Sequence, residues 1–151
     1  MQFSALLISA AALIPSALGC LNISIVYTFP YHSSGSNLFV EYIDNGVRHC
    51  YLNQKSPTVG GPATYSLPPQ IAGVGLNDTY QGCSFGMKSE IKLDLVNNKE
   101  KKSNNQMMQY TYINLNNDPT SYGPFDLGNR TETDAKGDKA ATWAWQTSAF
   151  C

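Results

Sequence analysis

The stretch Asn37–Asn53 constrains the fold of this chain more than any other. It reads NLFVEYIDNGVRHCYLN, with two runs rich in β-branched and aromatic residues around Asp44, Asn45 and Gly46. Such a turn sequence between two β-forming runs is the strongest short-range signal of a β-hairpin. We therefore predict two antiparallel strands joined at this turn.

The register of the hairpin depends on the length of its loop. A three-residue loop with Gly46 in the left-handed region pairs Val40 with Cys50 and Glu41 with His49, whereas a two-residue loop shifts the pairing by one. We favour the three-residue loop because it produces one nearly continuous apolar face. That face would carry Leu38, Val40, Tyr42, Cys50 and Leu52, and the second face Phe39, Glu41, Ile43, Val47, His49 and Tyr51.

Alternating or β-rich patterns recur along the rest of the chain. They predict strands at Leu21–Phe29, Ala63–Leu67, Tyr80–Phe85, Ser89–Val96 and Gln106–Leu115, and a short one near Phe125. Ala140–Cys151 could form a strand or a helix, and its TWAWQT core favours a strand. Gln54–Asp78 and Asn116–Lys139 are predicted to be mostly loop. The fold class that follows is all-β: an antiparallel β-sandwich or small β-barrel with two disulfides.

The beginning of the chain has the character of an export signal. Leu6–Leu18 is apolar, and Ala-Leu-Gly precedes Cys20 with small residues at the positions that signal peptidase reads. The run is too short to span a bilayer. We expect residues 1–19 to be a signal peptide and residues 20–151 a single secreted β domain. A bacterial lipoprotein signal with an acylated Cys20 is the alternative.

The four cysteines are Cys20, Cys50, Cys83 and Cys151. An even number in an exported chain indicates disulfides, and the spacing of cysteines and histidines does not match that of a metal site. Three pairings are possible. We favour Cys20–Cys151, which would join the two ends of the mature chain, together with Cys50–Cys83.

Three N-glycosylation sequons begin at Asn22, Asn77 and Asn129. With the leader and the paired cysteines, they indicate the eukaryotic secretory pathway and an extracellular location. The formal net charge of −1 offers no basic field for nucleic acid. No phosphate-binding, dinucleotide or hydrolase motif occurs, so we expect no cofactor. We also expect no metal, a monomer and no membrane span.

The candidate catalytic residues are His32, Glu41 and His49. Two histidines and a carboxylate, with Arg48 nearby, are the groups that a small secreted ribonuclease would use as acid, base and phosphate clamp. In the favoured register Glu41 lies opposite His49, but Arg48 points to the other face. We therefore favour a solvated Glu–His pair and expect no enzymatic activity.

The candidate binding residues are aromatic: Phe39 and Tyr51 on the hairpin, and Trp143 and Trp145 near the end of the chain. Exposed aromatic pairs bind sugar rings or partner proteins, whereas buried ones form core. The core is the expected place of the two tryptophans, because the chain has few other large apolar side chains.

Taken together, the leader, the β domain and a cysteine at each mature end resemble those of small secreted fungal effectors or elicitors that provoke a hypersensitive response in plants. The resemblance implies a protein that acts in virulence or plant defence by binding a host plant protein or a cell-wall polysaccharide. The alternatives are a carbohydrate- or cell-wall-binding module and a secreted hydrolase or ribonuclease-like protein.

Overall fold

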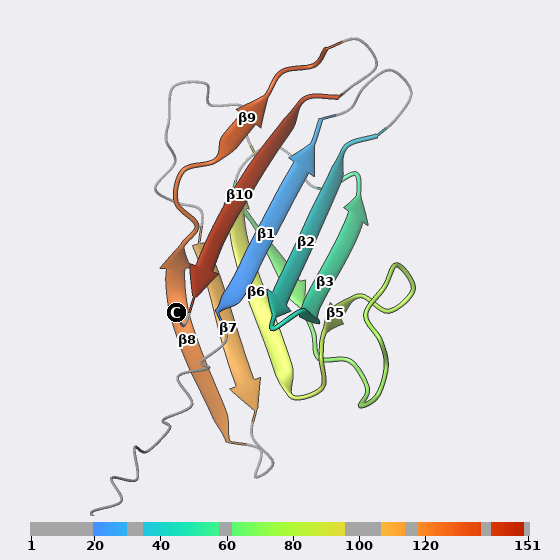
Figure 1. The fold of residues 1–151 in the computed structure, drawn as a ribbon, viewed down its shortest axis with the longest axis vertical. Helices are drawn as coiled ribbons and strands as arrows, with labels where there is room; N and C mark the ends of the chain where they lie inside the picture. Colours follow the sequence, from blue (N-terminus) through green and yellow to red (C-terminus); the bar gives the residue numbers. More distant parts are fainter. Residues whose placement is uncertain are drawn as a thin grey trace, which may run out of the picture.

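The computed structural model describes residues 20–29, 35–57, 62–95, 107–113, 118–136 and 140–149. Within these residues the chain forms ten β-strands and no helix (Figure 1). The strands are β1 (Leu21–Thr28), β2 (Asn37–Asp44), β3 (Val47–Lys55), β4 (Pro62–Leu67), β5 (Gly82–Cys83), β6 (Met87–Asp94), β7 (Met107–Ile113), β8 (Pro119–Asp126), β9 (Thr131–Thr133) and β10 (Thr142–Ala149).

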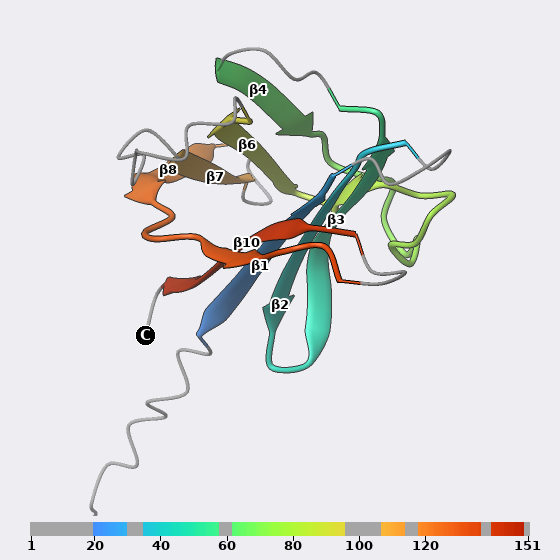
Figure 2. The ribbon, with the colours of Figure 1, turned by 90° about the horizontal axis from the view of Figure 1, so that it is seen from above.

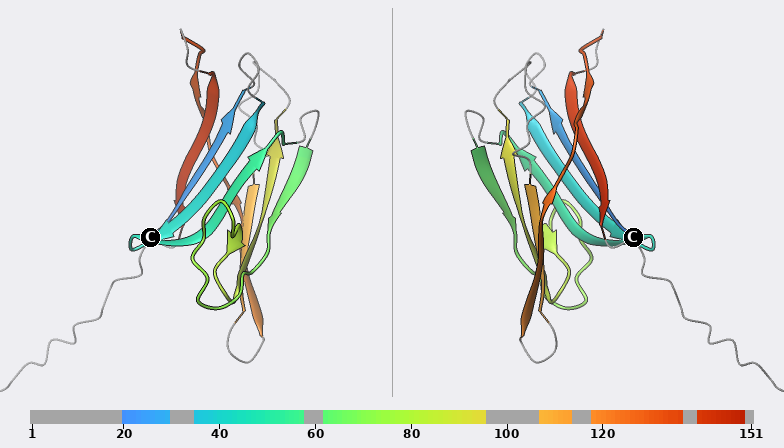
Figure 3. Two further views of the ribbon diagram at one scale, coloured as in Figure 1. Left: turned by 90° about the vertical axis from the view of Figure 1, so that its right-hand side faces the viewer. Right: turned by 90° about the vertical axis from the view of Figure 1, so that its left-hand side faces the viewer.

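The strands form two antiparallel sheets that pack face to face. One sheet has six strands in the order β5-β3-β2-β1-β10-β9, and the other has four in the order β4-β6-β7-β8. Figures 2 and 3 show the two layers from above and from the sides. The predicted antiparallel sandwich is confirmed, and the small-barrel alternative is wrong because the strands do not close into a barrel.

The core lies between the sheets and follows from the alternation along each strand. On β1 the residues from Leu21 to Tyr27 alternate between buried and more exposed positions, and β6 repeats this pattern from Met87 to Leu93. A polar contact crosses the core: the Tyr42 hydroxyl lies 2.9 Å from Ser89 Oγ, which donates to the Gln109 carbonyl at 2.7 Å. Burial raises the pKa of Tyr42, so its hydroxyl stays protonated and donates to Ser89.

The hairpin is present, but its predicted register is wrong. Asn45 and Gly46 adopt positive φ angles of 48° and 77° and form a two-residue turn, with Asp44 opposite Val47. A two-residue turn with positive φ at both positions matches the twist of the flanking strands, and Asn-Gly is its preferred sequence. Together with a β-bulge further along β3, this turn places Glu41 opposite Tyr51 instead of His49.

A β-bulge preserves the predicted buried face in spite of this shift. The pairing changes between Tyr42 and Ile43, where β3 contains His49 as one extra residue. Val40 pairs with Leu52 and Tyr42 with Cys50, and all residues of the predicted apolar face except Leu52 are fully buried. Leu52 is partly buried against the core.

The C-terminal third of the chain contains more strand than predicted. Ala140–Cys151 does include a strand, β10, which lies between β1 and β9. Asn116–Lys139, predicted as mostly loop, contributes β8 and β9. These two strands are almost entirely exposed, so they lack the apolar alternation that would mark them in sequence, and backbone pairing to β7 and β10 defines them.

Of the two predicted disulfides, Cys50–Cys83 is confirmed and is the one seen within the described residues. It joins directly opposite residues of β3 and β5. Cys151 lies outside the described residues, so its pairing with Cys20 stays a prediction. The ends of β1 and β10 do lie together, because Leu21 is paired with Ala149.

Candidate functional site

A shallow groove lies on the outer face of the six-stranded sheet, the face turned away from the four-stranded sheet. We call it the outer groove. Its volume is about 300 Å³, at the lower end of the range for small-molecule sites. Its lining includes Asn22 and Ser24 of β1, Glu41 and Ile43 of β2, and Gln146 and Ser148 of β10.

The shape of the outer groove follows from side-chain size along three neighbouring strands. Ser24 on the central strand β1 pairs with Glu41 on one side and with Gln146 on the other. A small side chain between two longer ones leaves a depression along the strand. At one end of the depression, Ser148 Oγ donates a hydrogen bond to Asn22 Oδ1 at 3.0 Å, which orients the asparagine amide.

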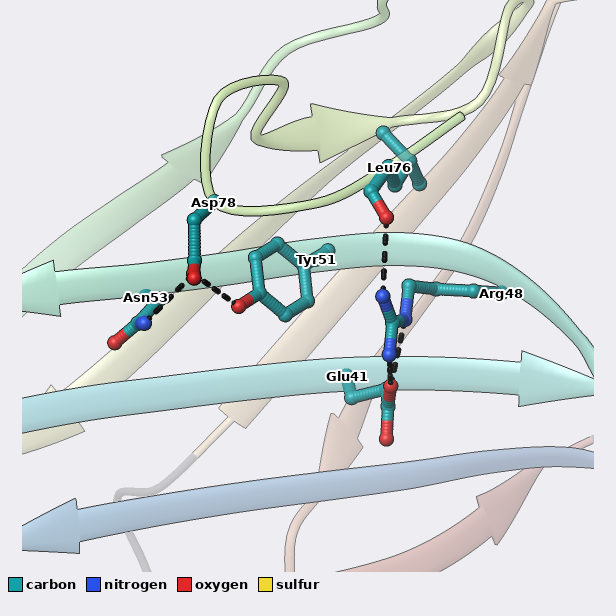
Figure 4. Close-up of polar contacts among 6 residues, drawn as sticks. All are labelled: Glu41, Arg48, Tyr51, Asn53, Leu76 and Asp78. Atoms are coloured by element: carbon teal, nitrogen blue, oxygen red, sulfur yellow. Dashed lines mark hydrogen bonds and ion pairs between the residues drawn. The ribbon is translucent and has the colours of Figure 1, made fainter. Parts of the chain in front are cut away.

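The Arg48 guanidinium fixes the Glu41 side of the groove. Its Nη2 and Nε lie 2.5 and 2.6 Å from Glu41 Oε1, and its Nη1 donates to the Leu76 carbonyl at 3.0 Å. The same group stacks over the Tyr51 ring at 4.7 Å. In Figure 4 the second carboxylate oxygen of Glu41 points away from Arg48, toward β1. Glu41 is thus an oriented acceptor whose charge is already paired.

The loop 70–81 covers the adjacent part of β3. Asp78 Oδ1 accepts hydrogen bonds from the Tyr51 hydroxyl at 2.5 Å and from Asn53 Nδ2 at 2.8 Å (Figure 4). Gln81 Oε1 accepts from the Asn53 backbone amide at 2.8 Å. Because of this cover, Tyr51 is only 6% exposed although it lies on the outer face.

The Tyr51–Asp78 hydrogen bond shifts the pKa of both groups. Donation by the Tyr51 hydroxyl holds the pKa of the Asp78 carboxyl below its ordinary value of 3.8. The same bond is the main cause that raises the pKa of Tyr51 above 10.0. The hydrogen bond requires ionised Asp78 and protonated Tyr51. It therefore stabilises the position of the loop 70–81 against β3 at pH values between the pKa of Asp78 and the pKa of Tyr51.

An apolar row lies beside the polar lining of the groove. Val26 of β1 pairs with Phe39 of β2 on one side and with Ala144 of β10 on the other, and all three are partly exposed. The Phe39 ring packs edge-on against Tyr51, with ring centroids 5.6 Å apart. Both aromatics were predicted on the second face of the hairpin, and the contact between them holds Phe39 in place.

The predicted catalytic residues are not brought together. His32 lies outside the described residues. Glu41 lies opposite Tyr51, so it does not face His49 as predicted. Arg48, predicted to point to the other face from Glu41, instead binds it. The bulge at His49 is the reason, because it reverses the alternation of β3 between Arg48 and Cys50.

Trp143 and Trp145 are only 4% and 1% exposed, which confirms their expected place in the core, and their assignment as candidate binding residues is wrong. Trp143 packs against Phe29 and Tyr27, with ring centroids 4.6 and 6.0 Å apart, and the Arg130 guanidinium lies 3.6 Å from the centre of its ring. The asparagines of the three sequons, Asn22, Asn77 and Asn129, are exposed.

Sequence reasoning missed most of the groove. Asn22 was noted only as a sequon, and Ser24, Gln146 and Ser148 were not singled out. The alternation of β1 and β10 does place these residues on one face, and that signal could have grouped them. No local pattern marks Asp78 as a partner of Tyr51, since the two are brought together only by the course of the loop.

Lowering the pH should release the loop 70–81. Stability from ionised Asp78 is complete above pH 3.8 and is lost as the pH falls through its lowered pKa, so hydrogen exchange in the loop should speed up there. Asp78→Asn should abolish this acid step, and Asp134→Asn, at an exposed position, should retain it. NMR titration of the carboxyl checks the premise: a midpoint at or above 3.8 contradicts it.

Among the described residues, no helix is long and apolar enough to cross a membrane, and no cluster of three or more His, Cys, Asp or Glu side chains could hold a metal ion. A scan against protein-family models and searches of curated proteins and of solved structures found no match to this chain.

Proposed function

We propose that the protein is an exported effector or elicitor that acts by recognition, with the outer groove as its binding surface, and that it catalyses no reaction. The observation that carries the proposal is the preorganisation of the groove. Glu41 is held by Arg48, and Asn22 by Ser148, before any ligand arrives. Side chains already fixed in place lose little conformational entropy on binding, and this favours recognition.

The β-sandwich beneath the groove suits such a role outside the cell. A disulfide ties β3 to β5 and is compatible with an extracellular location. The three exposed sequon asparagines are consistent with passage through a secretory pathway. Effector or elicitor activity is then the biological role that we assign to a stable, exported recognition domain.

Filling the groove tests this proposal. Ser148→Tyr places a large side chain in the lining, and Ser66→Tyr makes the same change at an exposed position of β4, in the other sheet. Both proteins are infiltrated into plant leaves, and cell death and defence output are scored against dose. We expect Ser148→Tyr to need at least a tenfold higher dose, and Ser66→Tyr to match the unsubstituted protein. Equal potency of all three proteins contradicts the proposal.

The hydrolase alternative is tested in the same samples. Degradation of RNA and of cell-wall polysaccharides is assayed for the unsubstituted protein and for the double variant His32→Ala/His49→Ala. We expect no degradation by either protein and full leaf activity of the double variant. Degradation that the double variant lacks would transfer the assignment to a hydrolase.

A further inference from the structure

The charge of the outer groove restricts the class of its ligand. Glu41 is the one ionised side chain in the lining, and its Oε1 is paired with Arg48. An anionic ligand would meet this carboxylate, and a cationic ligand would compete with an arginine already bound to it. The other polar groups, two amides and three hydroxyls, offer both donors and acceptors to a neutral partner.

The apolar row completes the match to one kind of neutral ligand. Val26, Phe39 and Ala144 lie on the next row of the sheet, beside Ser24, Glu41 and Gln146. A pyranose ring has hydroxyl groups at its edge and C–H groups on its faces. The polar row beside the part-exposed apolar row can therefore bind both parts of a sugar at once.

The fold argues against an extended peptide as the occupant. A peptide strand adds to a sheet by pairing with free backbone groups at an edge. The groove is centred on β1, which is paired along both sides, with β10 and with β2. A ligand in the groove must therefore be recognised by side chains, which suits a polyhydroxylated molecule.

We propose that the outer groove binds a neutral oligosaccharide, with Glu41, Gln146, Asn22 and Ser148 on its hydroxyl groups and Phe39 against a ring face. This inference rests on the proposed function, because it names the ligand class of the same groove. It also predicts that N-glycosylation of Asn22 prevents binding. A glycan attached to Asn22 would start within the groove lining, so binding requires the unmodified asparagine.

Binding is measured on the disulfide-bonded mature chain, made in a bacterial host without N-glycosylation. The probes are the neutral hexasaccharides of chitin, β-1,3-glucan, cellulose and xylan, with oligogalacturonate as the anionic comparison. We expect at least one neutral probe to bind with a dissociation constant below about 1 mM. Its affinity should change less than twofold between low and high salt, because no net charge is paired on binding.

Two variants locate the binding site. Ser148→Tyr should weaken binding at least tenfold, and Ser66→Tyr should leave it unchanged. Thermal unfolding of both variants, within a few degrees of the parent protein, excludes misfolding as the cause. Absence of binding to every neutral probe, binding of oligogalacturonate alone, or equal affinity of Ser148→Tyr overturns the proposal.

The leaf assay separates this inference from the proposed function. If Ser148→Tyr loses leaf activity but no neutral probe binds the parent, the groove is a recognition surface for another ligand class and the saccharide assignment is wrong. If Ser148→Tyr keeps leaf activity, the proposed function itself is wrong.

The role of Asn22 is tested by making the protein in a eukaryotic secretory host. The glycosylated parent should bind the probe at least tenfold more weakly than the unglycosylated parent made in bacteria. The double variant Asn77→Gln/Asn129→Gln from the eukaryotic host, which lacks the two sequons outside the groove, should bind as weakly as the glycosylated parent and so assigns the effect to Asn22. Equal binding of the glycosylated parent, or a peptide mass showing unmodified Asn22, contradicts the inference that glycosylation of Asn22 and ligand binding exclude each other.

Discussion

Val40→Asp is expected to abolish folding or to remove most of the stability of the domain. Val40 is fully buried between the two sheets, on the apolar face of the β2–β3 hairpin. A carboxylate there would have no partner for its charge, at a cost of roughly 3–5 kcal/mol. That is a large part of the roughly 5–15 kcal/mol that stabilises a typical domain.

Val47→Asp is the matched control, since Val47 belongs to the same hairpin but is 57% exposed. It should cost less than about 1 kcal/mol, including repulsion from Asp44 directly opposite. Secreted yield and chemical denaturation measure both variants. A yield and unfolding midpoint of Val40→Asp equal to those of Val47→Asp would show that the face assigned to the core is wrong.

Removing the internal disulfide is expected to have the next largest effect. Cys50 and Cys83 are separated by 33 residues, and loop closure of that size corresponds to roughly 4 kcal/mol in the unfolded chain. The double variant Cys50→Ala/Cys83→Ala should lose stability of this order in chemical denaturation. Reduction of the unsubstituted protein should remove at least as much stability, because it also breaks the predicted Cys20–Cys151 disulfide.

The same double variant should also loosen the loop 70–81. β5 has only two residues, and the backbone contacts of Cys83 with Pro68 and Gln70 hold the base of this loop. Hydrogen exchange in the loop should speed up more than in β1, which lies in the middle of the sheet. A loss below about 1 kcal/mol, or uniform acceleration of exchange, would show that the bridge is not what anchors β5.

The hairpin shows where local sequence was sufficient and where it was not. Alternation predicted which residues of β2 face the core, because a buried face requires apolar side chains at every second position. It could not predict the register. Two turns of different length are compatible with Asp44-Asn45-Gly46, and the bulge at His49 compensates for the shorter one. The shorter turn suits Asn-Gly, and the bulge keeps the apolar face of the hairpin toward the second sheet.

The candidate site depended even more on tertiary structure. Glu41 and Arg48 were both noted in sequence, yet their ion pair requires the bulge. Asp78 reaches Tyr51 from 27 positions further along the chain, and Gln146 lies beside Ser24 only because β10 pairs with β1. No local pattern encodes such pairings, since they depend on which strands become neighbours.

The sequence by itself determined the all-β class, most of the strands and the core face of the hairpin, and it favoured the Cys50–Cys83 pairing among three. Alternation and turn chemistry depend on residues that are close in sequence, and four cysteines allow only three pairings. Tertiary structure decided the order of strands in the two sheets, the full extent of the exposed strands β8 and β9, and the outer groove. The physical reason is that these features arise from contacts between distant segments, whose free energy is gained only when the whole sandwich assembles.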